Sequence, residues 1–208
     1  MSLFNVVARH FGGEVKIIAP TRFPDSRGFF GIEYREDEFE ELGIPDKFVQ
    51  DNFSRSKANV LRGLHFQLHP SMAKLMRVTA GRALLVAVDI RPESPTFLKW
   101  VMTEASAGNG LQIWAPAYFA RGFYALEDDT EVRYKCTGFF DSKSDKSIRW
   151  NDPAIGIEWP TQTPHLSDRD REAPTAAEFF GRSNASNIAR TSRYQYTRQG
   201  IRQRLPQQ

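Results

Sequence analysis

The sequence predicts a mainly β fold, an antiparallel sandwich or barrel of jelly-roll type. Three observations support it: short β-branched and apolar runs recur along the chain, clusters of Pro, Gly, Asp and Ser separate them, and helical patterns are few. The 208 residues, 40% of them hydrophobic, are enough for one well-buried domain. We place that domain at residues 1–175, followed by a C-terminal extension at 176–208.

The predicted strands follow in chain order. Residues 75–90 contain two apolar runs around a turn at Ala80 and Gly81, which predicts a β-hairpin. The other predicted strands are the runs at 15–19, 48–53, 60–68, 96–103, 111–115, 122–126 and 132–140. Short helical patterns are limited to residues 36–42, which end at Gly43, and 176–180.

The charge is distributed unevenly. The formal net charge is +3, but residues 181–208 hold six arginines and no Asp, Glu or Lys, which leaves the body mildly acidic. We therefore expect no nucleic-acid partner and read the extension as a loosely ordered tail, with a role in oligomer contacts or anion binding left open. We also expect a cytoplasmic protein with no membrane contact, because no apolar run is long enough to span a bilayer and no signal core is present.

Few residues of the chain suit a metal or a nucleophile. The four histidines are His10, His65, His69 and His165. His65 and His69 lie four apart on a run that reads as a strand, and no third ligand is near, so we expect no metal. The single cysteine, Cys136, has apolar neighbours and is predicted to be a buried, inert thiol.

Phosphate groups would need charged side chains here, because neither glycine-rich phosphate-loop pattern occurs. Arg27, Arg62 and Lys74 lie close to predicted strands and can supply that charge. Taken singly, each of them is better explained as an ordinary surface charge.

Several motifs, taken together and in order, match the pattern of a known protein family. Residues 48–67 read Phe-Val-Gln-Asp-Asn-Phe-Ser-Arg-Ser-Lys-Ala-Asn-Val-Leu-Arg-Gly-Leu-His-Phe-Gln, and 86–97 read Val-Ala-Val-Asp-Ile-Arg-Pro-Glu-Ser-Pro-Thr-Phe. Arg-Gly-Phe-Phe precedes them at 27–30, and Tyr-Lys-Cys-Thr, Trp-Asn-Asp-Pro-Ala-Ile-Gly-Ile-Glu-Trp-Pro and Leu-Ser-Asp-Arg-Asp follow at 134–137, 150–160 and 166–170. In this order they resemble the dTDP-4-dehydrorhamnose 3,5-epimerase family.

The resemblance implies a cupin-like, homodimeric jelly roll that needs no metal or other cofactor. Its activity would be epimerisation of a dTDP-4-keto-6-deoxyhexose at C3, C5 or both, in deoxysugar and cell-surface polysaccharide synthesis. A hydrogen beside the C4 ketone is acidic because the oxygen can take up charge as an enolate, so the site needs a base, a cation and an acid on the opposite face. By resemblance, His65 is the base, Asp170 orients it, and Tyr134 is the acid.

Other positions would bind the substrate, again by resemblance. Lys74 and Arg62 would line the sugar, Arg27 would reach the diphosphate across the dimer, and Phe30, Gln50 and Asn52 would hold the nucleotide. Arg62 and His65 are three apart and would face opposite sides of a regular strand. We therefore predict a bulge at Gly63.

Five positions depart from the family pattern and are predicted to cluster around the sugar pocket. They are Ile32, Met72, Leu85, Arg121 and Phe140, of which Arg121 replaces a usual histidine and Leu85 a usual acid. Arg121 cannot shuttle protons but can hold an enolate or a substrate carboxylate. Two alternatives follow, a single-carbon epimerase on another nucleotide sugar and a sugar-nucleotide-binding cupin without catalysis.

Overall fold

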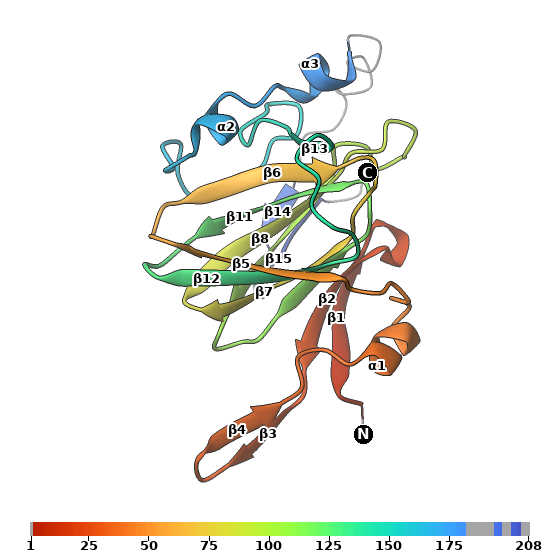
Figure 1. The fold of residues 1–208 in the computed structure, drawn as a ribbon. Coiled ribbons are helices and arrows are strands. Elements are labelled where there is room, and N and C mark those ends of the chain that lie inside the picture. The colour runs from red at the N-terminus through yellow and green to blue at the C-terminus, as the bar shows by residue number, and fades with distance from the viewer. Residues whose placement is uncertain (1, 182–193, 197–200, 205–208) are drawn as a thin grey trace.

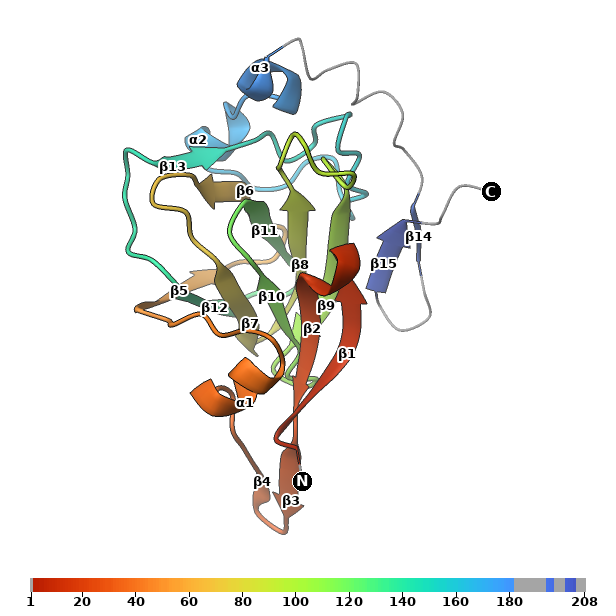
Figure 2. The same cartoon turned by 90° about the vertical axis from the view of Figure 1, so that its right-hand side faces the viewer.

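The computed structural model describes residues 2–181, 194–196 and 201–204, and Figures 1 and 2 show two antiparallel sheets that face each other. The first, here the Tyr134 sheet, has the order β1 (Phe4–His10), β2 (Val15–Pro20), β10 (Gln112–Ala115), β7 (Lys74–Ala80), β12 (Thr130–Cys136) and β5 (Gln50–Ser56). The second, the His65 sheet, has the order β13 (Asp145–Ser147), β6 (Leu61–Gln67), β11 (Phe119–Ala125), β8 (Arg82–Asp89), β9 (Trp100–Ser106), β15 (Ile201–Arg204) and β14 (Tyr194–Tyr196). This is the jelly roll that the sequence predicts.

The remaining elements are short. A separate hairpin, here the arm, joins β3 (Arg22–Asp25) to β4 (Gly28–Gly31) and projects from one end of the body (Figure 1). The helices are η1 (Phe11–Gly13), α1 (Glu36–Glu41), α2 (Asp168–Arg171) and α3 (Ala176–Phe180). Sequence patterns predicted α1 and α3 but missed β1, the arm and α2.

The predicted hairpin at residues 75–90 is wrong. Both strands exist, but β7 pairs with β10 and β12, whereas β8 pairs with β11 and β9, so the turn crosses between the sheets. Gly81 makes the crossing with φ +68, and a Cβ there would lie 2.5 Å from Oγ1 of Thr130. An apolar run predicts that a strand is present but not which strand it pairs with. Both β7 and β8 have buried side chains on both faces, so their sequences do not distinguish a hairpin from a crossing between sheets.

Three apolar clusters build the layers. One fills the space between the sheets and includes Val15, Met76, Leu85, Phe119 and Phe123. A second covers the outer face of the Tyr134 sheet, where α1 packs Phe39 against Ile18, Leu75 and Trp114. Each fully buried Leu, Ile or Phe contributes roughly 1.5–3 kcal/mol of transfer free energy.

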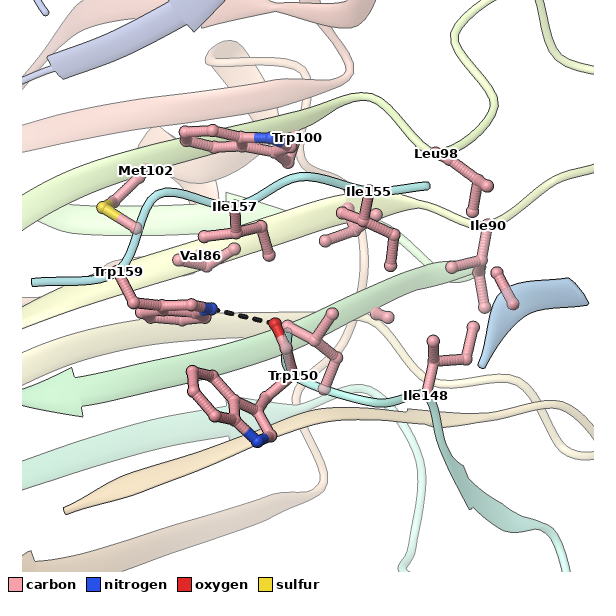
Figure 3. Close-up of a cluster of buried hydrophobic side chains, with 14 of the residues drawn as sticks. Val86, Ile90, Leu98, Trp100, Met102, Ile148, Trp150, Ile155, Ile157 and Trp159 are labelled. Carbon is pink, nitrogen blue, oxygen red and sulfur yellow. Dashed lines mark hydrogen bonds between the residues drawn. The ribbon is translucent and has the colours of Figure 1, made fainter. Parts of the chain in front are cut away.

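The third cluster covers the outer face of the His65 sheet (Figure 3). The segment 148–159 lies across β8 and β9, and the indole N–H of Trp159 donates to the carbonyl of Trp150 at 2.9 Å. Phe179 and Phe180 of α3 pack against the same cluster. The boundary at residue 175 stays a prediction, although α3 shares the core of the body.

Much of the predicted tail, including Arg182, Arg190, Arg193 and Arg198, lies outside the described residues. Two described pieces of the extension form strands: β14 pairs with β15, and β15 pairs with β9 at the edge of the His65 sheet.

Candidate active site

The candidate site lies inside the barrel, between the two sheets. One cavity of about 170 Å³ is lined by Ser54, Arg62, His65, Lys74, Met76, Arg121, Gly122, Phe123 and Tyr134. An adjoining cavity of about 160 Å³ is lined by Asn52, His65, Gln67, Met72, Lys74, Tyr134, Phe140, Asp145 and Arg169. Because His65, Lys74 and Tyr134 line both, we treat the two cavities as parts of one site.

A bulge in β6 brings Arg62 and His65 to the same cavity. His65 pairs with Arg121 and Arg62 with Phe123, so a three-residue step on β6 faces a two-residue step on β11. Gly63 sits in the bulge with φ +149, and a Cβ there would meet the Cα of Gly122 at 2.7 Å. The predicted bulge is confirmed, and glycine is required at it for both conformation and space.

His65 is paired with a buried carboxylate. Its Nε2 lies 2.5 Å from Oδ1 of Asp170, whose side chain is 3% exposed. Burial alone would raise the pKa of Asp170, but hydrogen bonds from His65 and Ser167 outweigh it and hold that pKa below its usual value. An ionised carboxylate can only accept, so in the neutral imidazole Nε2 carries the proton and Nδ1 keeps a lone pair.

Local structure fixes the position of Asp170. It lies in α2, where Ser167 is the N-cap and accepts from the Asp170 backbone N–H at 3.2 Å. Just before α2, His165 accepts a hydrogen bond from the Leu61 N–H at 3.0 Å, at the start of β6. The carboxylate is therefore anchored beside the strand that carries His65.

Lys74 and Tyr134 come from the opposite sheet. The Lys74 ammonium lies 5.1 Å from the centroid of the Tyr134 ring. Burial, with the nearby Arg121 charge, lowers the pKa of Lys74 to about 8. Burial, followed by the proximity of Cys136, raises the pKa of Tyr134, so the phenol holds its proton at neutral pH.

Cys136 itself is buried, and burial raises the pKa of its thiol, as expected for an inert cysteine.

Arg121 forms part of the wall beside His65. Its Nη2 donates to the carbonyls of Met72 and Ala115 at 2.9 Å each, and to that of Pro116. Burial lowers the pKa of Arg121 to about 9, which still leaves the guanidinium cationic at pH 7.

Three more predicted residues lie at or near the site. Arg62 donates from Nε to Ser56 at 3.1 Å. Gln50 donates to Asn52 at 2.8 Å, and Asn52 lines the cavity from β5. The arm holds the other two: Arg27 pairs with Asp25 at 2.6 Å, and Phe30 is 65% exposed. These two line cavities on the arm, and the structure does not bring them to His65 within one chain.

The five departures do not all cluster at the pocket. Arg121, Met72 and Phe140 line it, but Leu85 is part of the core between the sheets. Ile32 packs near α1 and lines a cavity of about 450 Å³ between the arm and the outer face of the Tyr134 sheet. That larger cavity has no histidine or tyrosine in its lining, so we do not take it as the catalytic centre.

Sequence reasoning missed several residues of the lining. Asp145 and Arg169 form an ion pair at 2.5 Å, and both face the cavity with Gln67. Arg169 lies within the Leu-Ser-Asp-Arg-Asp motif, which could have identified it, whereas no signal marks Asp145.

Within the part of the chain that the structure describes, no cluster of His, Cys, Asp or Glu could hold a metal, and His69 lies in a turn.

A helix able to cross a bilayer is absent from the described ranges.

Comparisons with known proteins identify relatives of this chain. The family model described as dTDP-4-dehydrorhamnose 3,5-epimerase matches residues 13–178. The enzyme of that name from Salmonella typhimurium is 51% identical over 164 residues, covering 77% of this chain and 90% of that protein. The crystal structure of a dTDP-6-deoxy-D-glucose-3,5-epimerase from Legionella pneumophila, in complex with dTDP-4-keto-L-rhamnose, aligns with a TM-score of 0.81 and 42% identity, covering 87% of this chain and 96% of that one.

A 3'-monoepimerase from Streptomyces bikiniensis in complex with dTDP-quinovose is more distant, with a TM-score of 0.75 and 29% identity over 84% of this chain and 93% of that one. The fold and the relatives together define a cupin-like sugar-nucleotide isomerase. Within that class, the chain belongs to the dTDP-4-dehydrorhamnose 3,5-epimerase family.

Proposed function

We propose that this enzyme epimerises a dTDP-4-keto-6-deoxyhexose at C3 and C5, with His65 as the base and Tyr134 as the acid. One observation carries the proposal: His65 and Tyr134 come from opposite sheets and line the same two cavities. A sugar ring held between them presents one face to each. Proton removal by one group and return by the other inverts the carbon.

The charge around the cavity suits the intermediate. Removal of a proton beside the ketone places negative charge on the C4 oxygen, and a cation in a site shielded from water stabilises that charge strongly. Lys74 stands beside Tyr134 for this purpose, while Asp170 holds the His65 ring and stabilises the imidazolium that forms. Neither step requires a cofactor.

The nucleotide is proposed to bind at the outer part of the cavity. Arg62 and Asn52 line it there, Gln50 holds Asn52, and Arg62 is the exposed member of the β6 bulge. Diphosphate oxygens can take two parallel hydrogen bonds from an arginine, which favours Arg62 over a lysine for this contact.

We also propose a homodimer in which each arm completes the partner's site. Arg27 is 88% exposed at the tip of the arm, and Phe29 and Phe30 beside it are exposed as well. Exposed phenylalanines on a projecting hairpin favour a protein contact over a solvated surface.

We also propose a cytoplasmic location, since the buried, unpaired Cys136 suits a compartment that keeps thiols reduced.

Subunit mixing tests the dimer. Arg27→Ala and His65→Ala variants are each expected to be weakly active, because each lacks one part of every site. Mixed dimers contain one intact site if Arg27 acts across the interface, so activity should return to about a quarter of the wild-type value when equal amounts exchange subunits. A mixture that stays as weak as its parents would place Arg27 in its own subunit's site, and light scattering would report the oligomeric state directly.

The reaction itself is tested in deuterated water. Wild-type enzyme and dTDP-4-keto-6-deoxyglucose should give deuterium at both C3 and C5, followed by the inverted sugar. His65→Ala should lower exchange by about 10²–10⁴-fold, the usual contribution of a positioned base. Exchange at one carbon only would identify a single-carbon epimerase, the activity of the Streptomyces bikiniensis relative. Tight binding without exchange would identify a binding protein and refute catalysis.

A further inference from the structure

Each proton-transfer group of the proposed mechanism has a cation beside it on its own sheet. On the His65 sheet, Arg121 is the direct cross-strand partner of His65. On the Tyr134 sheet, Lys74 lies against the Tyr134 ring. Directly opposite residues on paired strands have their Cβ atoms about 5 Å apart on one face. Arg121 and His65 therefore face the same cavity together.

The Arg121 guanidinium is buried but only partly satisfied. The residue is 3% exposed, and Nη2 donates to three backbone carbonyls. Nε and Nη1 are buried, and no hydrogen-bond partner for them is found in the described part of the chain. Among the described residues, no carboxylate forms an ion pair with it, in contrast to Arg169 in the same lining, which pairs with Asp145. Buried donors normally find partners, so unpaired ones next to a cavity indicate that the partner arrives with the ligand.

The chemistry of the sugar identifies that partner. The carbon that loses its proton to His65 is bonded to the ketone carbon, so the ketone oxygen lies one atom further along, within reach of a group next to the base. We propose that Arg121 is the oxyanion-stabilising residue on the His65 side of the sugar, where it supplies a fixed positive charge to the enolate oxygen. This role rests on the proposed function.

Arg121 and Lys74 differ in how firmly the positive charge is held in place. The guanidinium is held by the carbonyls of Met72, Ala115 and Pro116, so its charge needs no reorganisation when the enolate forms. The Lys74 ammonium lies against the Tyr134 ring, and its pKa of about 8 makes its charge vary with pH near neutrality. The pKa of Arg121 is lowered only to about 9, so at pH 8, where Lys74 is half charged, Arg121 is still mostly cationic.

The competing explanation is structural: the guanidinium could serve only to bind three carbonyls together. The test compares Arg121→Met, which removes the charge, and Arg121→Lys, which retains it, with Arg133→Met on the outer face of β12 as the matched control. We expect Arg121→Met to lower kcat for deuterium exchange by about 10²–10³-fold with KM changed less than threefold, as for loss of one oxyanion-hole donor. Arg121→Lys should recover at least tenfold of that loss, and Arg133→Met should behave as wild type.

A second readout separates charge from packing. Removing Arg121 removes a like charge near Lys74, whose other titratable or charged neighbours are Cys136, Asp145 and Arg169. The basic limb of the pH–rate profile should therefore move to higher pH in Arg121→Met and stay in place in Arg121→Lys. If the charge of Arg121 did not reach the site, this limb would stay unmoved, whatever the change in melting temperature.

The outcomes are distinct. A rise in KM without loss of kcat would overturn the enolate role and indicate that Arg121 binds an anionic group of the substrate. Exchange within threefold of wild type in a folded Arg121→Met would also overturn it. If Arg121→Met does not fold, the same criteria apply to Arg121→Gln. Absence of exchange in the wild-type enzyme would instead refute the proposed function.

Discussion

The two walls of the cavity are built in different ways. Around Tyr134 the ladder is regular: Tyr134 pairs with Asn52 on one side and Met76 on the other, and the register shift between β12 and β7 lies nearer the start of β12, between Glu131 and Val132. The His65 wall is interrupted by the bulge at Gly63, and a helix from far along the chain supports it through Asp170. Regular pairing is enough to present a phenol, whereas an oriented imidazole requires a bulge and a hydrogen-bond partner. Function therefore depends on irregular structure mainly at the His65 wall.

The strongest test of this contrast removes the carboxylate that supports His65. Asp170→Asn keeps the shape of the side chain but can donate to Nε2, which would shift the imidazole proton to Nδ1. We expect kcat for exchange to fall about 10³-fold, measured by deuterium incorporation. Circular dichroism should show a folded chain, and unchanged kcat would remove Asp170 from the mechanism.

The bulge itself is tested by Gly63→Ala. A Cβ at Gly63 would meet backbone at 2.7 Å and require φ +149, so we expect a loss of about 3 kcal/mol in unfolding free energy. Gly138→Ala is the matched control, because its nearest contact is at 3.6 Å. Urea titration of both variants provides the measurement. Equal stability of the two would show that the bulge tolerates a side chain.

On the regular wall, Tyr134→Phe removes only the phenol oxygen. Proton removal by His65 does not need that oxygen, but return of a proton to the other face does. We expect net inversion to fall about 10²-fold while exchange falls less, with both followed by NMR in deuterated water. Equal loss of inversion and exchange would contradict the assignment of Tyr134 as the acid alone.

The smallest expected effect concerns pH and Lys74. With a pKa of about 8, Lys74 loses its charge above that pH, so kcat should fall up to about tenfold per unit. Stability should change in the opposite direction: between pH 8 and 10.5 the unfolded chain binds more protons at this residue, so its contribution to stability rises with pH. Comparing wild type with Lys74→Met at pH 7.5 and 9.5 isolates both effects. Parallel pH dependence in the two proteins would contradict them.

The sequence predicted the strands better than their partners. Alternating residues located β6, β7 and β8, but pairing depends on contacts between distant segments, and the 75–90 hairpin was therefore predicted wrongly. The bulge at Gly63 was predictable because Arg62 and His65 are three apart and both had to face one pocket. Asp145 reaches the cavity only through the pairing of β13 with β6, which no local pattern reveals.

The resemblance identified the residues of the barrel site more fully than their surroundings. His65, Tyr134, Lys74 and Arg62 all line the cavity, and Asp170 contacts His65. Arg27 and Phe30 lie exposed on the arm, away from His65, and only the proposed homodimer would bring them to a site. Their roles and that of the extension stay predictions.

The carboxylate of Asp170 and the imidazole of His65 are 105 positions apart in the chain. During synthesis most strands of the barrel therefore emerge from the ribosome before α2 does. A nascent chain can assemble most of its core while its histidine still lacks a partner. A chain that stops before α2 would retain most strands, but its His65 would lack the carboxylate that orients it, so catalysis is expected to begin only after α2 has been made.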